Sequence, residues 1–166
     1  MANIEEALTP GSPLHVEHHI ALAQAINRQP VVGQELAYAE RVTQDTTTST
    51  PADNTTLMAN VIAGLSCTVT GVGRPVEVEA FVPVVAHSLS TGLVYLHIMQ
   101  DGVQVSMVNF RVVAASVGTM LICKRRVIIP DGVSTTFVAA KSIDTAGTGT
   151  YWADTAAPMY LSVVQR

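Results

Sequence analysis

The sequence is poor in charge, and above all in lysine. Charged residues make up 13% of the 166 residues, whereas an average soluble domain carries about 25%. Lysine occurs only at Lys124 and Lys141. Isolated β proteins commonly place lysine on edge strands, where its charge prevents edge-to-edge pairing. Its scarcity indicates that other protein covers part of this surface.

Long apolar runs are also absent. Hydrophobic residues reach 48% of the chain, yet no apolar run has the ~18–20 residues that a membrane-spanning helix needs. The N-terminal stretch MANIEEAL is acidic and lacks the basic and continuous apolar regions of a secretory signal. We therefore expect no membrane insertion and no cleaved signal, and we attribute the apolar surface to contacts with other subunits.

The sequence also lacks the excess of basic residues that is typical of nucleic-acid-binding proteins. The formal net charge is −4, and the local cluster Lys124, Arg125 and Arg126 is too small to reverse it, so we interpret that cluster as a solvated or interface strip. Gly147 and Gly149 lack the strand-to-helix context of a phosphate-binding loop. We predict neither nucleic-acid binding nor a cofactor.

The two cysteines, Cys67 and Cys123, lie in apolar strand patterns and show no C-x-x-C spacing. This placement favours buried free thiols that act as small hydrophobic side chains. A disulfide between facing strands stays open as an alternative, because the sequence does not place the two Cα atoms.

No arrangement of residues indicates catalysis. His87, Ser88, His97 and Asp101 contain the right side chains for a hydrolase, but no G-x-S-x-G elbow accompanies them and nothing places a base beside a nucleophile. His15 and His19 lie four apart on one predicted helix face, yet no further ligand completes a metal site. We predict a protein that is not an enzyme and has no catalytic, cofactor-binding or metal-binding residues.

Residues 1–33 are predicted to form an N-terminal arm and one short anchoring helix. Ser12 is a suitable N-cap and Pro13 suits the first helical position. The helix should run to about Arg28 and stop before Pro30. A helix this short needs a packing partner. The residues expected to supply that interface recur at helical spacing: Leu14, Val16, Ile20, Ala23 and Ile26.

Residues 34–166 have the pattern of an all-β domain. Thr- and Val-rich runs are predicted as strands at 35–48, 65–70, 76–82, 93–100, 103–114, 120–129, 135–143 and 159–164, with Asp-Gly turns at 101–102 and 131–132. Pro83 should end its strand or place it at an edge. Eight or nine antiparallel strands predict a two-sheet β-sandwich similar to a jelly roll.

Two sets of residues in this domain are candidates for contacts. The strand at 93–100 is apolar on both faces, so we expect Val94, Leu96 and Ile98 to face the core. The residues of its other face are expected at a subunit interface: Tyr95, His97 and Met99. The aromatic pair Tyr151 and Trp152 is a candidate glycan contact, with burial in a core or subunit contact as the alternative.

Three stretches resemble small virion proteins of tailed bacteriophages, especially those that infect actinobacteria. Pro10-Gly11-Ser12-Pro13-Leu14 with the helix ending Ala25-Ile26-Asn27 is similar to their N-terminal attachment segment. Leu65–Thr70 with Gly73–Val78 is similar to their first sandwich strands, and Ala157–Val163 to their closing strand. The resemblance implies a head-decoration or minor tail protein and supplies no catalytic residues. We expect no full receptor-binding fibre, because the sequence shows no pattern of a long shaft or extra tip domain.

We therefore expect a non-enzymatic structural protein on the surface of a phage particle. The first hypothesis is a capsid decoration protein, assembled as a homotrimer and docked on the major capsid protein through its N-terminal segment. The alternative is a minor tail or short fibre protein whose sandwich loops bind a host-surface glycan.

Overall fold

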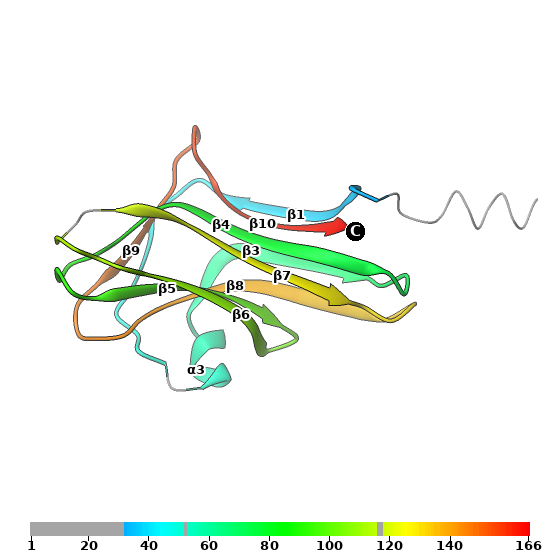
Figure 1. Ribbon diagram of the computed structural model, residues 1–166, viewed down its shortest axis with the longest axis horizontal. Coiled ribbons are helices and arrows are strands. Elements are labelled where there is room, and N and C mark those ends of the chain that lie inside the picture. Colours follow the sequence, from blue (N-terminus) through cyan, green and yellow to red (C-terminus); the bar gives the residue numbers. More distant parts are fainter. Residues whose placement is uncertain (1–31, 52, 116–117) are drawn as a thin grey trace, which may run out of the picture. The chain divides into compact units, whose positions relative to one another are not determined.

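The computed structural model describes residues 32–51, 53–115 and 118–166, which form two packed β-sheets (Figure 1). The first sheet contains β1 (Glu35–Arg41), β2 (Asp45–Thr47), β4 (Pro75–His87), β7 (Thr119–Ile128), β9 (Gly149–Trp152) and β10 (Met159–Gln165). The second contains β3 (Val61–Thr70), β5 (Leu93–Gln100), β6 (Val103–Arg111) and β8 (Ser134–Ile143). The one helix in these ranges is α3 (Asn54–Met58).

The connectivity is that of a jelly roll. Strand β4 pairs with β10 along its first half and with β9 along its second, so β9 and β10 act as one interrupted strand beside it. Strands β1 and β2 likewise continue one another along β10 and β9. Counted this way, each sheet has four strands, ordered β1-β10-β4-β7 and β3-β8-β5-β6. The predicted two-sheet antiparallel sandwich is confirmed, including its jelly-roll character.

Strand alternation builds the core between the two sheets. On β4 the even-numbered residues Val76, Val78, Ala80 and Val82 are buried, while the odd-numbered residues between them face outward. The same period of two buries Val94, Leu96 and Ile98 on β5, as the sequence predicted. Large side chains such as Phe137 and Leu161 fill the space between the sheets.

Several predicted strand boundaries were wrong. Strand β3 begins at Val61 and not at Leu65, and β6 ends at Arg111 and not at Ala114. The expected long strand 35–48 is divided into β1 and β2, with Val42–Gln44 between them. Strand β4 does not end at Pro83 but continues to His87 in the interior of its sheet. A register shift between Val82 and Val85 accommodates the proline. Proline has no N–H to donate to a neighbouring strand, and at a bulge one residue is left out of the hydrogen-bond ladder.

The hairpin at Asp101-Gly102 has the backbone expected of its sequence. Asp101 has φ of 48° and Gly102 has φ of 83°, and positive φ at both central positions defines a type I′ turn. At the second Asp-Gly pair, Gly132 has a positive φ of 72° and Asp131 does not have a positive φ. The first pair therefore closes the β5–β6 hairpin, whereas the second lies in a turn that connects β7 of the first sheet to β8 of the second.

Both cysteines are buried and unbridged, as predicted. Cys67 and Cys123 are free thiols inside the sandwich. Burial is the main cause that raises the pKa of Cys67 to about 11. A thiol with so high a pKa carries little thiolate and is a poor nucleophile, so both side chains serve as core packing.

Candidate functional site

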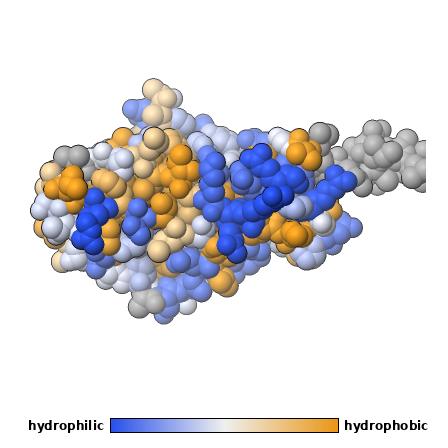
Figure 2. All heavy atoms as spheres, in the orientation of Figure 1, coloured by the Kyte–Doolittle hydropathy of each residue, from blue (hydrophilic) through white to orange (hydrophobic). Residues whose placement is uncertain are grey.

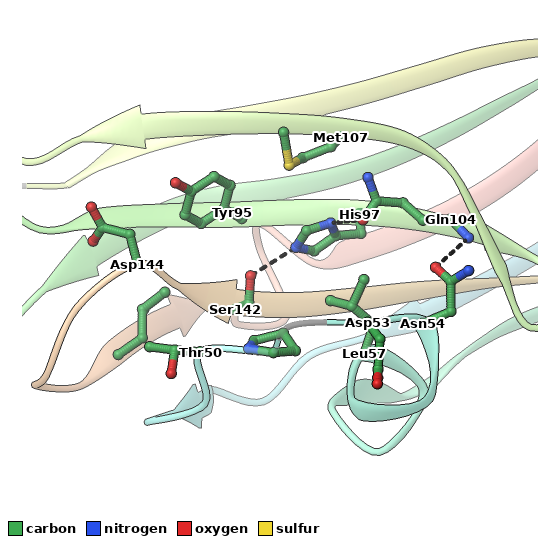
Figure 3. Close-up of a pocket in the computed structure, with 12 residues that line it drawn as sticks. Thr50, Asp53, Asn54, Leu57, Tyr95, His97, Gln104, Met107, Ser142 and Asp144 are labelled. Carbon is green, nitrogen blue, oxygen red and sulfur yellow. Dashed lines mark hydrogen bonds between the residues drawn. The ribbon is translucent and has the colours of Figure 1, made fainter.

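The second sheet carries a pocket of about 590 Å³ on its outer face (Figure 3). Strands β5 and β8 form its floor, with Tyr95, His97 and Ser142 on them. Strand β6 adds Met107 on one side, and the segment before and within α3 forms the other. The pocket is therefore built between a rigid sheet and a short covering segment of the same chain.

A row of three polar side chains lies along the pocket floor. His97 Nδ1 is 3.1 Å from Gln104 Oε1, and His97 Nε2 is 2.8 Å from Ser142 Oγ (Figure 3). An amide oxygen only accepts, so Nδ1 carries the proton and the serine hydroxyl donates to Nε2. Burial lowers the pKa of His97 below its usual 6.5, although the Gln104 hydrogen bond opposes that shift. The floor is therefore polar and uncharged at neutral pH.

The covering segment is held by hydrogen bonds that follow from its sequence. Asp53 caps α3 by accepting from the backbone N–H of Thr56, and Thr56 closes a capping box by accepting from the N–H of Asp53. The side-chain oxygen of Asn54 accepts from the backbone N–H of Gln104. The last contact ties the covering segment to the start of β6.

The covering segment corrects the prediction for Tyr95, His97 and Met99. Met99 is fully buried, and its cover is Leu57 of α3, packed with Ala140 in a small second core. His97 is 4% exposed and Tyr95 is half-buried. A segment of the same chain therefore covers the part of β5 that was assigned to a subunit interface, and Tyr95 lines the pocket instead.

The aromatic pair at 151–152 has two different environments. Tyr151 is fully buried, and its hydroxyl lies 2.7 Å from the carbonyl oxygen of Tyr95 and 2.9 Å from that of Ser142. Its assignment as a glycan contact is wrong, because strand alternation on β9 turns it into the core and leaves no face for a ligand. Trp152 points the other way and lines a hollow of about 320 Å³ with Pro83 and Asp154.

The outer face of the first sheet bears an apolar strip, which we define as Tyr38, Phe81, Met120, Ile122 and Tyr160. The Phe81 and Tyr160 rings stack with centroids 5.0 Å apart, and the Tyr38 and Tyr160 rings with centroids 5.8 Å apart. Met120 is 60% exposed and Ile122 is 42% exposed. Figure 2 shows hydrophobic residues gathered over β4 and the start of β7. This strip crosses four neighbouring strands without a cover in the described part of the chain.

A charged group borders the apolar strip. Lys124 on β7 forms an ion pair with Glu79 on β4, and the Tyr160 hydroxyl also donates to Glu79. Partial burial alone would raise the pKa of Glu79, but these two hydrogen bonds, together with the positive charges of Lys124 and Arg166, lower it. These polar side chains next to the strip are thus paired with one another, and the exposed members of the strip itself are Tyr38, Met120 and Ile122.

The predicted helix interface, formed by Leu14, Val16, Ile20, Ala23 and Ile26, lies outside the described residues. Within the ranges that the structure does describe, no helix is long and apolar enough to cross a membrane. The same ranges contain no group of three or more His, Cys, Asp or Glu side chains placed to hold a metal ion.

Comparison with known proteins yields a weak structural likeness. No protein-family model and no curated protein sequence matches the chain. Among solved structures, one similar chain is described as the EclA C-terminal domain, a sugar-binding protein. It is 13% identical, each chain is covered over 84% of its length, and the TM-score is 0.34. At this distance the likeness carries no functional argument.

Proposed function

We propose that this chain is a non-enzymatic structural protein that assembles with copies of itself through the apolar strip of the first sheet. The observation that carries the proposal is the row of stacked, solvent-facing aromatic rings contributed by β1, β10 and β4. A contiguous apolar surface on a rigid sheet is typical of a protein–protein contact. The shortage of charged residues elsewhere in the sequence supports the same interpretation.

The setting that we propose is the surface of a phage particle, on the strength of the sequence resemblance described above. There the protein would act as a homotrimeric capsid decoration protein that docks on the major capsid protein through its N-terminal segment. Each docked copy would add contacts that exist only in the assembled particle, and so stabilise the shell by mass action.

Self-association can be tested with two matched surface variants of the full chain. Ile122 is 42% exposed within the strip, and Val133 is 44% exposed in the turn before β8. We expect light scattering to report a trimer for the wild type and for Val133→Asp, and a monomer for Ile122→Asp, because a buried unpaired carboxylate opposes association. A wild type that remains monomeric at high concentration and does not bind empty shells would contradict the proposal.

We infer that Ser142 and His97 serve as pocket floor and not as a nucleophile and base. A hydroxyl hydrogen-bonded to an imidazole is the arrangement that activates a serine. Here, however, the imidazole is oriented by the neutral amide of Gln104, and Ser142 is 4% exposed. We expect no labelling of Ser142 by a fluorophosphonate probe and no turnover of simple esters. Labelling that disappears in Ser142→Ala would show an enzyme instead.

The second candidate is a minor tail or short fibre protein that binds a host-surface glycan. The specific observation in its favour is the pocket on the second sheet, whose rim and floor are mostly polar and lie on rigid strands. Addition of the purified protein should then block adsorption of the phage to its host. A decoration protein would leave adsorption unchanged, so this measurement separates the two candidates.

A further inference from the structure

The pocket on the second sheet has many hydrogen-bonding groups that the protein does not use itself. In the described part of the chain, no hydrogen bond engages the hydroxyl of Tyr95 or of Thr50, the amide nitrogen of Gln104, or the second oxygen of Asp144. These groups include both donors and acceptors, and their residues line one hollow (Figure 3). Such a lining suits a ligand that carries several hydroxyl groups.

The charges that line the pocket favour a neutral ligand over an anionic one. Two carboxylates, Asp53 and Asp144, line the pocket, and none of its described lining residues is lysine or arginine. The floor adds no positive charge at neutral pH, because burial lowers the pKa of His97 even though its hydrogen bond to Gln104 opposes that shift. An anionic ligand would meet two like charges in the lining, whereas Arg111, the cation whose charge reaches Tyr95, lies outside it. A neutral ligand meets only hydrogen-bonding partners.

The pocket also offers apolar surface to a ligand. The Tyr95 ring is half-buried and stacks beside His97, with centroids 5.9 Å apart and planes 18° apart. Met107 on β6 is 47% exposed above the same floor (Figure 3). A sugar ring offers hydroxyl groups at its rim and C–H groups on its face, so an aromatic face beside mixed donors and acceptors matches both.

We propose that this pocket binds a neutral saccharide, with Tyr95 as the ring that the sugar contacts and Asp144 as an acceptor for its hydroxyl groups. This inference rests on the second candidate function, glycan binding, and specifies its site and ligand class. It does not depend on self-association through the apolar strip. It also relocates the predicted glycan contact from the 151–152 pair to the outer face of β5 and β8.

The test uses the full chain on a printed array of neutral oligosaccharides together with their sialylated and sulfated counterparts. We expect binding to a neutral glycan and weaker binding to its acidic counterpart. For the best neutral glycan, calorimetry should show an affinity about tenfold lower for Tyr95→Ala. Asp144→Asn should also weaken binding, although the asparagine oxygen can still accept from the Leu93 N–H, which donates to Asp144 at 2.7 Å. Circular dichroism checks that the variants fold.

Trp152→Ala is the matched control, since Trp152 lines the separate hollow on the first sheet. It should bind as the wild type does. If Trp152→Ala loses binding while Tyr95→Ala and Asp144→Asn keep it, the pocket inference is overturned and glycan binding itself survives. If acidic glycans bind more tightly than neutral ones, the proposed ligand class is wrong. If no glycan binds, both the inference and the second candidate function fail.

Discussion

The outer faces of the two sheets differ in whether their apolar side chains are covered by the same chain. On the second sheet, Met99 and Ala140 lie under Leu57, so a segment between two strands of the same chain covers them. On the first sheet, Tyr38, Met120 and Ile122 remain exposed in the described part of the chain. The comparison teaches that a two-sided apolar strand does not by itself indicate a subunit interface. A local cover must first be excluded.

The largest effect is expected from removal of the intramolecular cover. Leu57→Ala deletes the buried side chain that packs on Met99 and Ala140, which should cost about 2–3 kcal/mol of the free energy of unfolding. Urea denaturation measures the loss. Thr55→Ala, at an exposed position of the same helix, is the control and should change stability little. Equal stabilities of the two variants would show that α3 does not cover the sheet.

The floor beneath the cover predicts a pH dependence. The pKa of His97 is lowered in the folded state, so the unfolded chain takes up a proton that the folded protein does not. Stability is therefore full above the unfolded pKa of about 6.5 and falls as pH drops from there toward the folded pKa. The non-titrating variant His97→Gln should lose less stability than the wild type between about pH 7.5 and about pH 5.5, as measured by urea midpoints. An identical pH dependence in both proteins would place the proton uptake elsewhere.

A smaller effect should follow from loosening one end of the cover. Asp53→Ala removes the cap that accepts from Thr56 N–H at 2.9 Å, whereas Asp53→Asn keeps an acceptor oxygen. We expect Asp53→Ala to unfold at a lower urea concentration than the wild type, by less than Leu57→Ala does, and Asp53→Asn to lie between. Hydrogen exchange at the amides of α3 should follow the same order. A stability loss in Asp53→Ala as large as that in Leu57→Ala would contradict this ranking.

The sequence predicts the sandwich well because period-two burial and Asp-Gly turns are local signals. The β5–β6 hairpin illustrates this, since Asp101 and Gly102 adopt the positive φ that their residue types favour. The end of β4 was missed because its bulge at Pro83 depends on pairing with β7 and β9. Strand β9 was missed because a Gly- and Thr-rich run resembles a loop until β2 and β4 pair with it.

The candidate site was harder to predict than the fold. Tyr95 and His97 were singled out, but the lining residues Thr50, Asp144 and Gln104 lie on three other segments that meet only in the folded domain. The one local signal for the cover was Asp53 with Thr56 three residues later, a weak form of a capping box that precedes a single helical turn. Tyr151 and Trp152 could not be told apart without knowing the register of β9.

The exposure of two methionines tests the central claim most directly. Met120 lies in the apolar strip of the first sheet and is 60% exposed, and Met107 lies on the second sheet and is 47% exposed. Hydroxyl-radical footprinting of the full chain, read by mass spectrometry, measures the oxidation of each thioether. If neighbouring copies cover the strip, Met120 will be protected relative to Met107 at high protein concentration and will lose that protection on dilution. If Met120 is oxidised at least as fast as Met107 at every concentration, the strip is bare in solution and the account is wrong.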